Sequence, residues 1–423
     1  MFYGRKNNKK VGKAMFKKRS KKDLSKDSSP LKDLLPKQKN TLKPFSENLH
    51  EIKQRIEEIF GDTADLMIED IQIGQRKGIL CYLTTMTDWQ AVTSKVLDPI
   101  LNTAVKKDNI TSESEWKNFG RETFSGSQHS FIEFELQTIE NIINGYACIF
   151  IEGMKLILSI QIQATGKRAI EEPSTQTVVR GPKDGFIEDI ETNISLIRKK
   201  IKNPALRFQS YTIGKETSTR VYLAYVDGII NLKILEEIRK RIGDVKTNAL
   251  FDSGILEEFV EDKSFTPFPL VYNSERPDVV AAHLISGKFA LFVDGSPFIL
   301  TAPTIFSDFL SMSEDYYQPF LMGSFIRLIR YFSFLLALLL PSLYVAVSTF
   351  HYEMIPTQLL ISIISQREGI PFPAVIEALM MESRFGMEKH QTIISVCFGA
   401  GCQTLTFTLQ KFAKKSSTLA NFG

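Results

Sequence analysis

The hydrophobic positions in the first part of the chain follow first a helical and then a strand-like spacing. Apolar residues recur every three or four positions from Leu49 to Ile59, and Gly61 follows, which predicts an amphipathic helix with a glycine stop. Three apolar runs predict buried strands, at 79–84, 146–151 and 155–163, and the last two form a hairpin. We therefore predict a small α/β domain over residues 46–165.

A second α/β domain is predicted for residues 166–265. Its clearest element is a helix over 186–202, with isoleucines at every third or fourth position, acidic residues at its start and basic residues at its end. A strand over 220–226 and a helix over 232–242, stopped by Gly243, follow.

A juxtamembrane connector is predicted for residues 266–326. Two short apolar runs flank Asp294-Gly295 in this stretch. An Asp-Gly pair between such runs is a strong signal for a tight hairpin turn.

Residues 331–350 contain no charged side chain. A helix that crosses a bilayer core needs about 20 apolar residues, and this run has that length. Arg327 and Arg330 precede it, which favours a cytoplasmic location for the preceding domains. We predict a transmembrane helix over 327–351. The alternative is the core helix of a soluble enzyme, which would normally show one polar face.

The predicted fold class is therefore an α/β cytoplasmic region of two small mixed-sheet domains followed by a helical membrane region. Pro341 removes one backbone hydrogen bond in the middle of the span. In lipid that bond must be replaced by a neighbouring helix, by a hydroxyl group or by water.

Residues 352–382 alternate between apolar and polar character. Arg367 and Glu368 interrupt one apolar run, and Glu377 lies within the next. Broken or charged helix at membrane depth is stable only against protein or a water-filled cavity. We interpret this stretch as a re-entrant or interfacial segment beside a polar path, and an amphipathic helix pair on the outer surface is the alternative. The candidate pore or gating residues are Glu377, Arg367, Glu368 and Pro341.

A strongly basic segment begins the chain. Residues 1–43 hold 15 Lys and Arg against 3 Asp and Glu, whereas the remainder holds 37 against 45. Such a composition predicts a disordered tail over 1–45. Its partner is expected to be anionic membrane lipid, and a merely solvated tail is the alternative. Nothing downstream indicates a nucleic-acid-binding motif. No apolar run follows Met1, so we expect no signal peptide and a cytoplasmic N-terminus.

The chemistry-bearing residues indicate neither a metal site nor catalysis. The four cysteines form no Cys-x-x-Cys pair and the five histidines are scattered, so we expect free thiols, no metal and no cofactor. The motifs of serine hydrolases, zinc proteases and phosphate-binding loops are absent from the sequence. We therefore predict a non-enzyme, with a membrane-anchored enzyme as a weaker alternative.

Several blocks, in order along the chain, resemble a known family. They are Arg180-Gly181-Pro182-Lys183-Asp184-Gly185-Phe186, Ser274-Glu275-Arg276-Pro277-Asp278, Val293-Asp294-Gly295-Ser296-Pro297-Phe298, Glu314-Asp315-Tyr316-Tyr317, Glu353-Met354-Ile355-Pro356-Thr357 and Arg367-Glu368-Gly369-Ile370-Pro371-Phe372-Pro373. Each block is weak alone, but the ordered set is similar to GerA-type spore germination receptor A subunits.

The resemblance implies a two-part cytoplasmic α/β region and several membrane helices in the spore inner membrane. It also implies a transporter-like B subunit that binds the nutrient, a lipoprotein C subunit and a homo-oligomeric assembly. The role it implies is to couple nutrient binding to ion release, and a membrane-anchored scaffold without conduction is the alternative. The resemblance further implies apolar spans after Glu382, whereas 383–423 is an atypical, basic-flanked tail. We therefore expect a truncated or frame-altered member, whose number of spans, bitopic or multi-pass, stays open.

Ten residues of these blocks are candidates for coupling or interface roles: Arg180, Gly181, Pro182, Gly185, Phe186, Arg276, Pro277, Asp278, Asp294 and Gly295. The loop at 180–182 either holds an anion at a helix N-terminus or only leads the chain into the helix with a sheltered arginine–carboxylate pair. Arg276 and Asp278 are expected to pair at a domain–membrane junction. The Asp294-Gly295 pair is expected to serve as a turn rather than a site.

Overall fold

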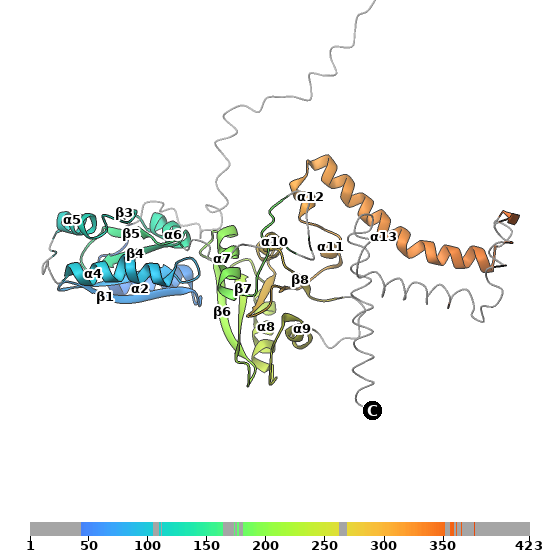
Figure 1. Cartoon of the computed structure of the whole chain (residues 1–423), viewed down its shortest axis with the longest axis horizontal. Helices are drawn as coiled ribbons and strands as arrows, with labels where there is room; N and C mark the ends of the chain where they lie inside the picture. Colours follow the sequence, from blue (N-terminus) through green and yellow to red (C-terminus); the bar gives the residue numbers. More distant parts are fainter. Residues whose placement is uncertain are drawn as a thin grey trace, which may run out of the picture. The chain divides into compact units, whose positions relative to one another are not determined.

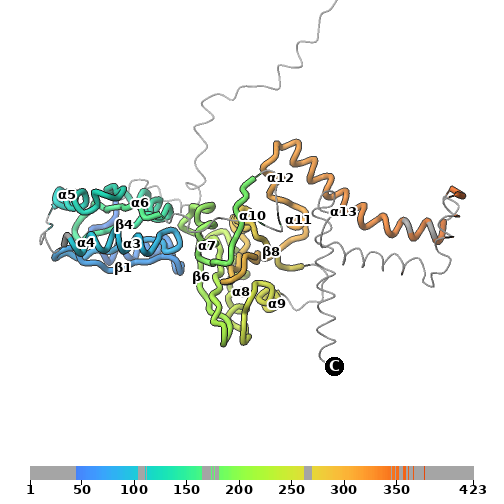
Figure 2. Tube along the Cα trace, viewed as in Figure 1, coloured from blue at the N-terminus to red at the C-terminus, as the bar shows by residue number. Residues whose placement is uncertain are grey.

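The computed structural model describes residues 44–104, 110, 112–163, 173, 176, 181–261, 269–351, 356–358, 361, 365 and 376. Two compact units divide the chain (Figures 1 and 2), and each is described by itself. Unit 1 draws on Met1–Glu58, Met67–Gln163 and Lys202–Pro204. Unit 2 draws on Ile59–Leu66, Ala164–Ile201 and Ala205–Gly423.

Unit 1 is built on a five-stranded sheet in the order β1-β2-β4-β5-β3. Its strands are β1 (Leu66–Ile73), β2 (Arg76–Leu83), β3 (His129–Ile132), β4 (Tyr146–Ile151) and β5 (Ile157–Gln161). Its helices are α2 (Leu49–Phe60), α3 (Trp89–Val92), η1 (Thr93–Leu97), α4 (Asp98–Ala104), α5 (Glu113–Thr123) and α6 (Glu135–Ile143). Strand β4 pairs antiparallel with β2 and with β5, which confirms the predicted hairpin.

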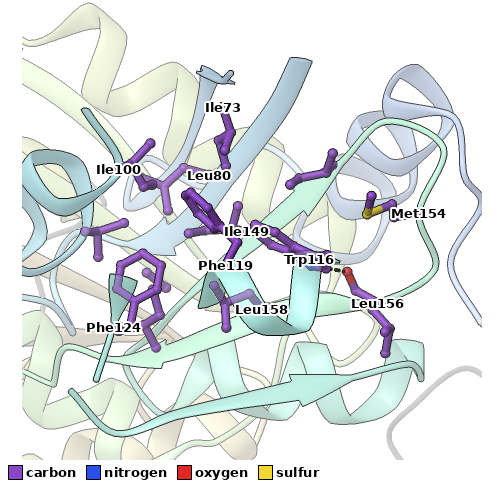
Figure 3. Packing of buried hydrophobic residues seen from close by; sticks show 14 of the residues in the cluster. Ile73, Leu80, Ile100, Trp116, Phe119, Phe124, Ile149, Met154, Leu156 and Leu158 are labelled. Atoms are coloured by element: carbon purple, nitrogen blue, oxygen red, sulfur yellow. Dashed lines mark hydrogen bonds between the residues drawn. The ribbon is translucent and has the colours of Figure 1, made fainter. Parts of the chain in front are cut away.

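The core of unit 1 forms where α5 packs on the sheet (Figure 3). Trp116 and Phe119 of α5 are buried and their rings stack with centroids 5.6 Å apart. The indole N–H of Trp116 donates a 3.1 Å hydrogen bond to the backbone oxygen of Leu156, so the one polar atom of this large side chain is satisfied. The apolar face of α5 thus fixes the helix against β4 and β5.

Unit 2 also has a five-stranded sheet, in the order β6-β7-β9-β10-β8. Its strands are β6 (Leu206–Ile213), β7 (Thr219–Val226), β8 (Tyr272–Ser274), β9 (Phe289–Val293) and β10 (Ile299–Ala302). Its helices are α7 (Ile190–Lys200), α8 (Leu232–Asp244), α9 (Ser253–Val260), α10 (Pro277–Ile285), α11 (Phe306–Phe309), α12 (Glu314–Tyr317) and α13 (Phe320–Thr349). All the register-paired neighbours in this sheet run antiparallel.

Helices cover both faces of this second sheet. Side chains alternate between the two faces along each strand, so each strand contributes residues to a core on either side. In β7, Val221 and Leu223 point into a core formed with α8 and α9. Ala224 and Val226 point into a second core formed with α7 and α10. The two α/β domains and the apolar C-terminal helix of the predicted fold class are confirmed, with antiparallel sheets.

The structure corrects two predicted helix boundaries. The helix expected over 186–202 begins only at Ile190, because the carboxylate of Asp189 accepts the backbone N–H of Thr192 as an N-cap. Phe186 lies before the helix and donates its N–H to the backbone oxygen of Glu275 at 2.8 Å. Gly243 does not stop α8, which continues to Asp244.

The segment Ile59–Leu66 belongs to unit 2, although the elements on both sides of it belong to unit 1. The backbone N–H of Ala64 donates to the oxygen of Phe208 in β6 at 2.8 Å. Likewise, the hairpin expected within the 266–326 connector supplies β9 and β10 to the second sheet. The second unit therefore gathers residues from three separate stretches of the sequence.

Helix α13 is 30 residues long and contains Pro341. Its stretch Phe320–Val347 is long and apolar enough to cross a membrane. The helix begins seven residues earlier than the span expected from the sequence. At 1.5 Å per residue it is about 45 Å long, which exceeds the ~30 Å of a hydrocarbon core.

Candidate functional site

A cluster of polar side chains lies at the start of α10, and we name it the Arg276 cluster: Arg276, Asp278 and Tyr317. The guanidinium of Arg276 donates to both carboxylate oxygens of Asp278, at 3.1 and 2.7 Å. The hydroxyl of Tyr317 donates to the same carboxylate at 2.8 Å. The side chains of Arg276 and Asp278 are only 2% and 9% exposed, so their attraction is weakly screened by water.

The remaining donors of Arg276 bind the loop that leads to α7. They reach the backbone oxygens of Gln176 at 3.3 Å and of Pro182 at 3.1 Å. Ser274 donates to the side chain of Gln176 at 2.8 Å, and its hydroxyl accepts the backbone N–H of Arg276. One arginine thus holds two chain segments that are about a hundred residues apart in sequence.

Gly181 lies against the ring of Tyr317. Its backbone has a φ of +139°, and a Cβ atom at this position would lie 2.8 Å from the ring. Only glycine permits both this conformation and this approach. The ring of Tyr317 therefore packs directly on the backbone of Gly181. Both roles predicted for the loop at 180–182 stay predictions.

The electrostatics of the cluster follow from its burial and its hydrogen bonds. Burial alone would raise the pKa of Asp278, but the hydrogen bonds from Arg276 and Tyr317 and the charge of Arg276 outweigh it and lower this pKa. Burial and the hydrogen bond to Asp278 raise the pKa of Tyr317 to about 12. At neutral pH Asp278 is therefore ionised and Tyr317 is a neutral phenol.

A second cluster connects α12 to α13, and we name it the Asp315 cluster: Asp315, Arg327 and Arg330. Arg330 donates to both carboxylate oxygens of Asp315, at 2.8 and 3.1 Å, and to the backbone oxygen of Leu310 at 2.9 Å. Arg327 lies 3.5 Å from the same carboxylate. Gly323 faces Asp315 so closely that a Cβ atom would overlap the backbone oxygen of Asp315.

The two clusters share α12. Tyr317 at its end belongs to the Arg276 cluster, and Asp315, two residues earlier, binds α13. A helix of four residues therefore forms two polar contacts, one with the start of α10 and one with the long apolar helix.

The structure brings together most of the predicted coupling residues. Gly181, Pro182, Arg276, Pro277 and Asp278 lie in or beside the Arg276 cluster. Gly185 and Phe186 are buried in the segment before α7, where Phe186 bonds the backbone of Glu275. Asp294 and Gly295 lie elsewhere, at the turn between β9 and β10. Asp294 pairs there with Arg220 at 3.2 Å, and Gly295 has a φ of +85°, as a turn requires.

Four predicted residues lie outside the described residues: Arg180, Arg367, Glu368 and Glu377. Pro341 is described and lies inside α13, which continues through it. Its candidate role in gating remains a prediction.

Sequence reasoning did not assign roles to Tyr317 and Asp315. Both lie in a block that carries the family resemblance, which was the available signal. From the sequence, Arg327 and Arg330 are recognisable only as charges that flank a span, because spacing along the chain does not reveal their partner on α12.

The described residues contain no group of three or more His, Cys, Asp or Glu side chains that could hold a metal ion. Cys81 and Cys148, on the neighbouring strands β2 and β4, are buried free thiols. Burial raises the pKa of both thiols, that of Cys148 to about 12, so neither is a thiolate at neutral pH.

Fold and site together define a class of protein with two α/β units and a polar connection to an apolar helix of membrane-spanning length. The chain matches the family Bacillus/Clostridium GerA spore germination protein over residues 54–390, more than half of its length. It belongs to this family of spore germination proteins.

Three relatives have similar sequences, and two of them are named spore germination proteins. The chain is 38% identical over 344 residues to spore germination protein KA of Bacillus subtilis, which covers 81% of this chain and 62% of that protein. It is 35% identical to spore germination protein GerLA of Bacillus cereus, over 79% of this chain and 68% of the relative. It is also 37% identical to the uncharacterized membrane protein YfkQ of Bacillus subtilis, over 82% of this chain and 67% of that protein. The chain thus spans about two thirds of the length of these relatives.

One solved structure is also similar, the N-terminal domain of the A subunit of the Bacillus megaterium spore germinant receptor GerK3. It shares 31% identity, with a TM-score of 0.49, and the match covers 63% of this chain and 98% of that domain.

Proposed function

We propose that this chain is the A subunit of a nutrient-responsive spore germination receptor and that it couples nutrient binding by a partner subunit to ion release. The observation that carries the coupling role is α12, whose Tyr317 and Asp315 connect the Arg276 cluster to Arg330 of α13. Family membership supports the receptor role.

The proposed partners are a transporter-like B subunit, a lipoprotein C subunit and further copies of this chain. The proposed location is the spore inner membrane, with α13 as a span and the two α/β units in the cytoplasm. The apolar length of α13 and the two arginines before its uncharged stretch support this orientation.

A chimeric receptor tests the coupling role. The relative supplies the part of the receptor that this chain does not match. Residues 44–351 would replace the matching part of spore germination protein KA in spores that lack the native protein. We expect nutrient-triggered ion release from the chimera. We expect Asp315→Asn to slow that release several-fold, because it removes the charge that binds Arg330 while receptor levels stay unchanged.

Asp294→Asn is the matched control, since Asp294 forms an exposed ion pair in the same unit. Equal rates of ion release for both variants, at equal receptor levels, would show that the α12 connection does not transmit the nutrient signal. A scaffold role would then replace the coupling role.

Glu377 is the proposed pore-lining residue, because an ionisable side chain in a membrane segment is costly unless it has a function. In a complex that contains this chain with its own residues 352–382, we expect Glu377→Ala to change ion flux while the receptor still assembles. An unchanged flux would favour a scaffold that does not contribute to the conduction path.

A further inference from the structure

The short helix α11 has two chemically different sides. Its inner side is docked on unit 2: the ring of Phe309 lies 5.3 Å from that of Tyr272 in β8, and Leu310 is fully buried. Asp308 is paired with Lys288, and its carboxylate also accepts the backbone N–H of Ile305 at 2.8 Å. The one acidic group of α11 is therefore neutralised and turned toward the unit.

The outer side of α11 is apolar and exposed. Ile305 is 62% exposed and Phe306 is 45% exposed. The ring of Phe306 nevertheless contacts Phe334 of α13, with centroids 5.2 Å apart. Figure 1 shows α11 between α10 and α13. This exposed side is thus continuous with the side of the long apolar helix.

The position of Phe334 gives the level of this contact along α13. It lies four residues beyond Arg330, about 6 Å along the helix axis, within the uncharged stretch 331–350. Phe306 therefore lies at the level of the first turn of this uncharged stretch. The apolar residues at the start of α13 are also exposed on its outer side: Phe320, Leu321, Phe325 and Leu328.

We propose that Ile305 and Phe306 enter the lipid layer beside α13, at the boundary between headgroups and acyl chains. This inference rests on the proposed function only in requiring that α13 crosses the membrane. Large apolar side chains next to a span gain from leaving water, and no charge on the outer side of α11 opposes it. Because Phe309, Leu310 and the Lys288–Asp308 pair hold α11 on unit 2, the insertion seats that unit on the membrane surface.

Tryptophan fluorescence in lipid vesicles tests the proposal with the full chain. Ile305→Trp would be reconstituted in phosphatidylcholine/phosphatidylglycerol vesicles that contain phosphatidylcholine brominated at either a shallow or a deep position of the acyl chain. Trp89 and Trp116, the two native tryptophans, both lie in unit 1 and give the background. We expect the new tryptophan to be quenched several-fold more strongly by the shallow label than by the deep one.

Two further variants make the result decisive. Leu339→Trp, near the middle of the span, should be quenched more by the deep label. Phe251→Trp, 72% exposed in unit 2 before α9, should stay at background. If Ile305→Trp stays at background quenching, as Phe251→Trp does, while Leu339→Trp is quenched, the lipid contact of α11 is refuted. The proposal that α13 crosses the membrane is then still supported.

If neither Ile305→Trp nor Leu339→Trp is quenched, both proposals are refuted: α13 does not cross the bilayer and α11 does not contact lipid. Phe306→Trp, which keeps an aromatic ring against Phe334, provides a second reporter of the same position. Shallow quenching of Phe306→Trp supports the proposal even where Ile305→Trp cannot be prepared, and background quenching overturns it.

Discussion

Arg198 of α7 is a buried cation whose stability depends on its partners. Its side chain is fully buried, and its guanidinium donates to both oxygens of Asp65, at 2.9 and 2.8 Å, and to Thr63 at 3.2 Å. Its charge also lies over the ring of Phe208, 4.9 Å from the centroid. Removal of one partner of such a pair leaves a buried charge uncompensated.

Asp65→Asn is therefore expected to destabilise unit 2 by about 3–5 kcal/mol. The exposed pair of Asp294 with Arg220 gives a matched control, and Asp294→Asn should cost less than ~1 kcal/mol. Urea unfolding of the full chain in detergent, with hydrogen exchange at the backbone N–H of Ala64 as a local readout, measures both. Similar losses of unfolding free energy for the two variants would show that burial does not determine how much an ion pair contributes to stability.

His283 makes unit 2 sensitive to mild acid. Burial, together with the charge of Lys288, lowers its pKa to about 4, and its ring bonds Thr301 at 2.8 Å. In the unfolded chain the pKa is about 6.5, so between these values the unfolded state binds more protons. This contribution to stability is present above pH ~6.5 and is lost as the pH falls toward 4.

We expect His283→Asn, which keeps a polar atom near Thr301, to reduce the fall in melting temperature between pH 7 and pH 4.5. Thermal unfolding of both proteins across this range provides the measurement. An unchanged pH dependence would show that other groups cause the acid sensitivity.

At the scale of elements, long helices with a one-sided apolar stripe could be predicted from sequence, and α2 and α8 confirm this. Helix α10 was not predicted, because Pro277–Ile285 is apolar nearly all round and shows no single stripe. The early start assigned to α7 was wrong because Phe186 pairs with Glu275, a contact that spacing along the chain does not reveal.

The contact between α12 and α13 depends on Gly323. A methyl group there would overlap the backbone oxygen of Asp315, so Gly323→Ala must push the two helices apart. We expect faster hydrogen exchange in α12 and slower nutrient-triggered ion release in the chimeric receptor. Ser324→Ala, at an exposed position of the same helix, should change neither. Equal behaviour of the two variants would refute the close packing of α12 on α13.

For the whole molecule, the connection through α12 predicts that its two contacts, at Tyr317 and at Asp315, contribute to ion release as one path. Tyr317→Phe releases one end and Asp315→Asn the other, so either change should interrupt the same path. We expect the double variant to slow ion release in the chimeric receptor hardly more than the stronger single variant. Fully additive effects on the logarithm of the rate would indicate two independent contacts.

The sequence by itself determined the two α/β units, the long apolar helix and the family, because periodicity and short motifs are local properties of the chain. It also indicated the Arg276–Asp278 pair, whose members are two residues apart. Only the tertiary structure decided that Tyr317 joins this pair, that Asp315 binds Arg330 and that Asp65 neutralises Arg198. These contacts join residues from 15 to 133 positions apart, and only the packing of the folded backbone brings such side chains within hydrogen-bonding distance.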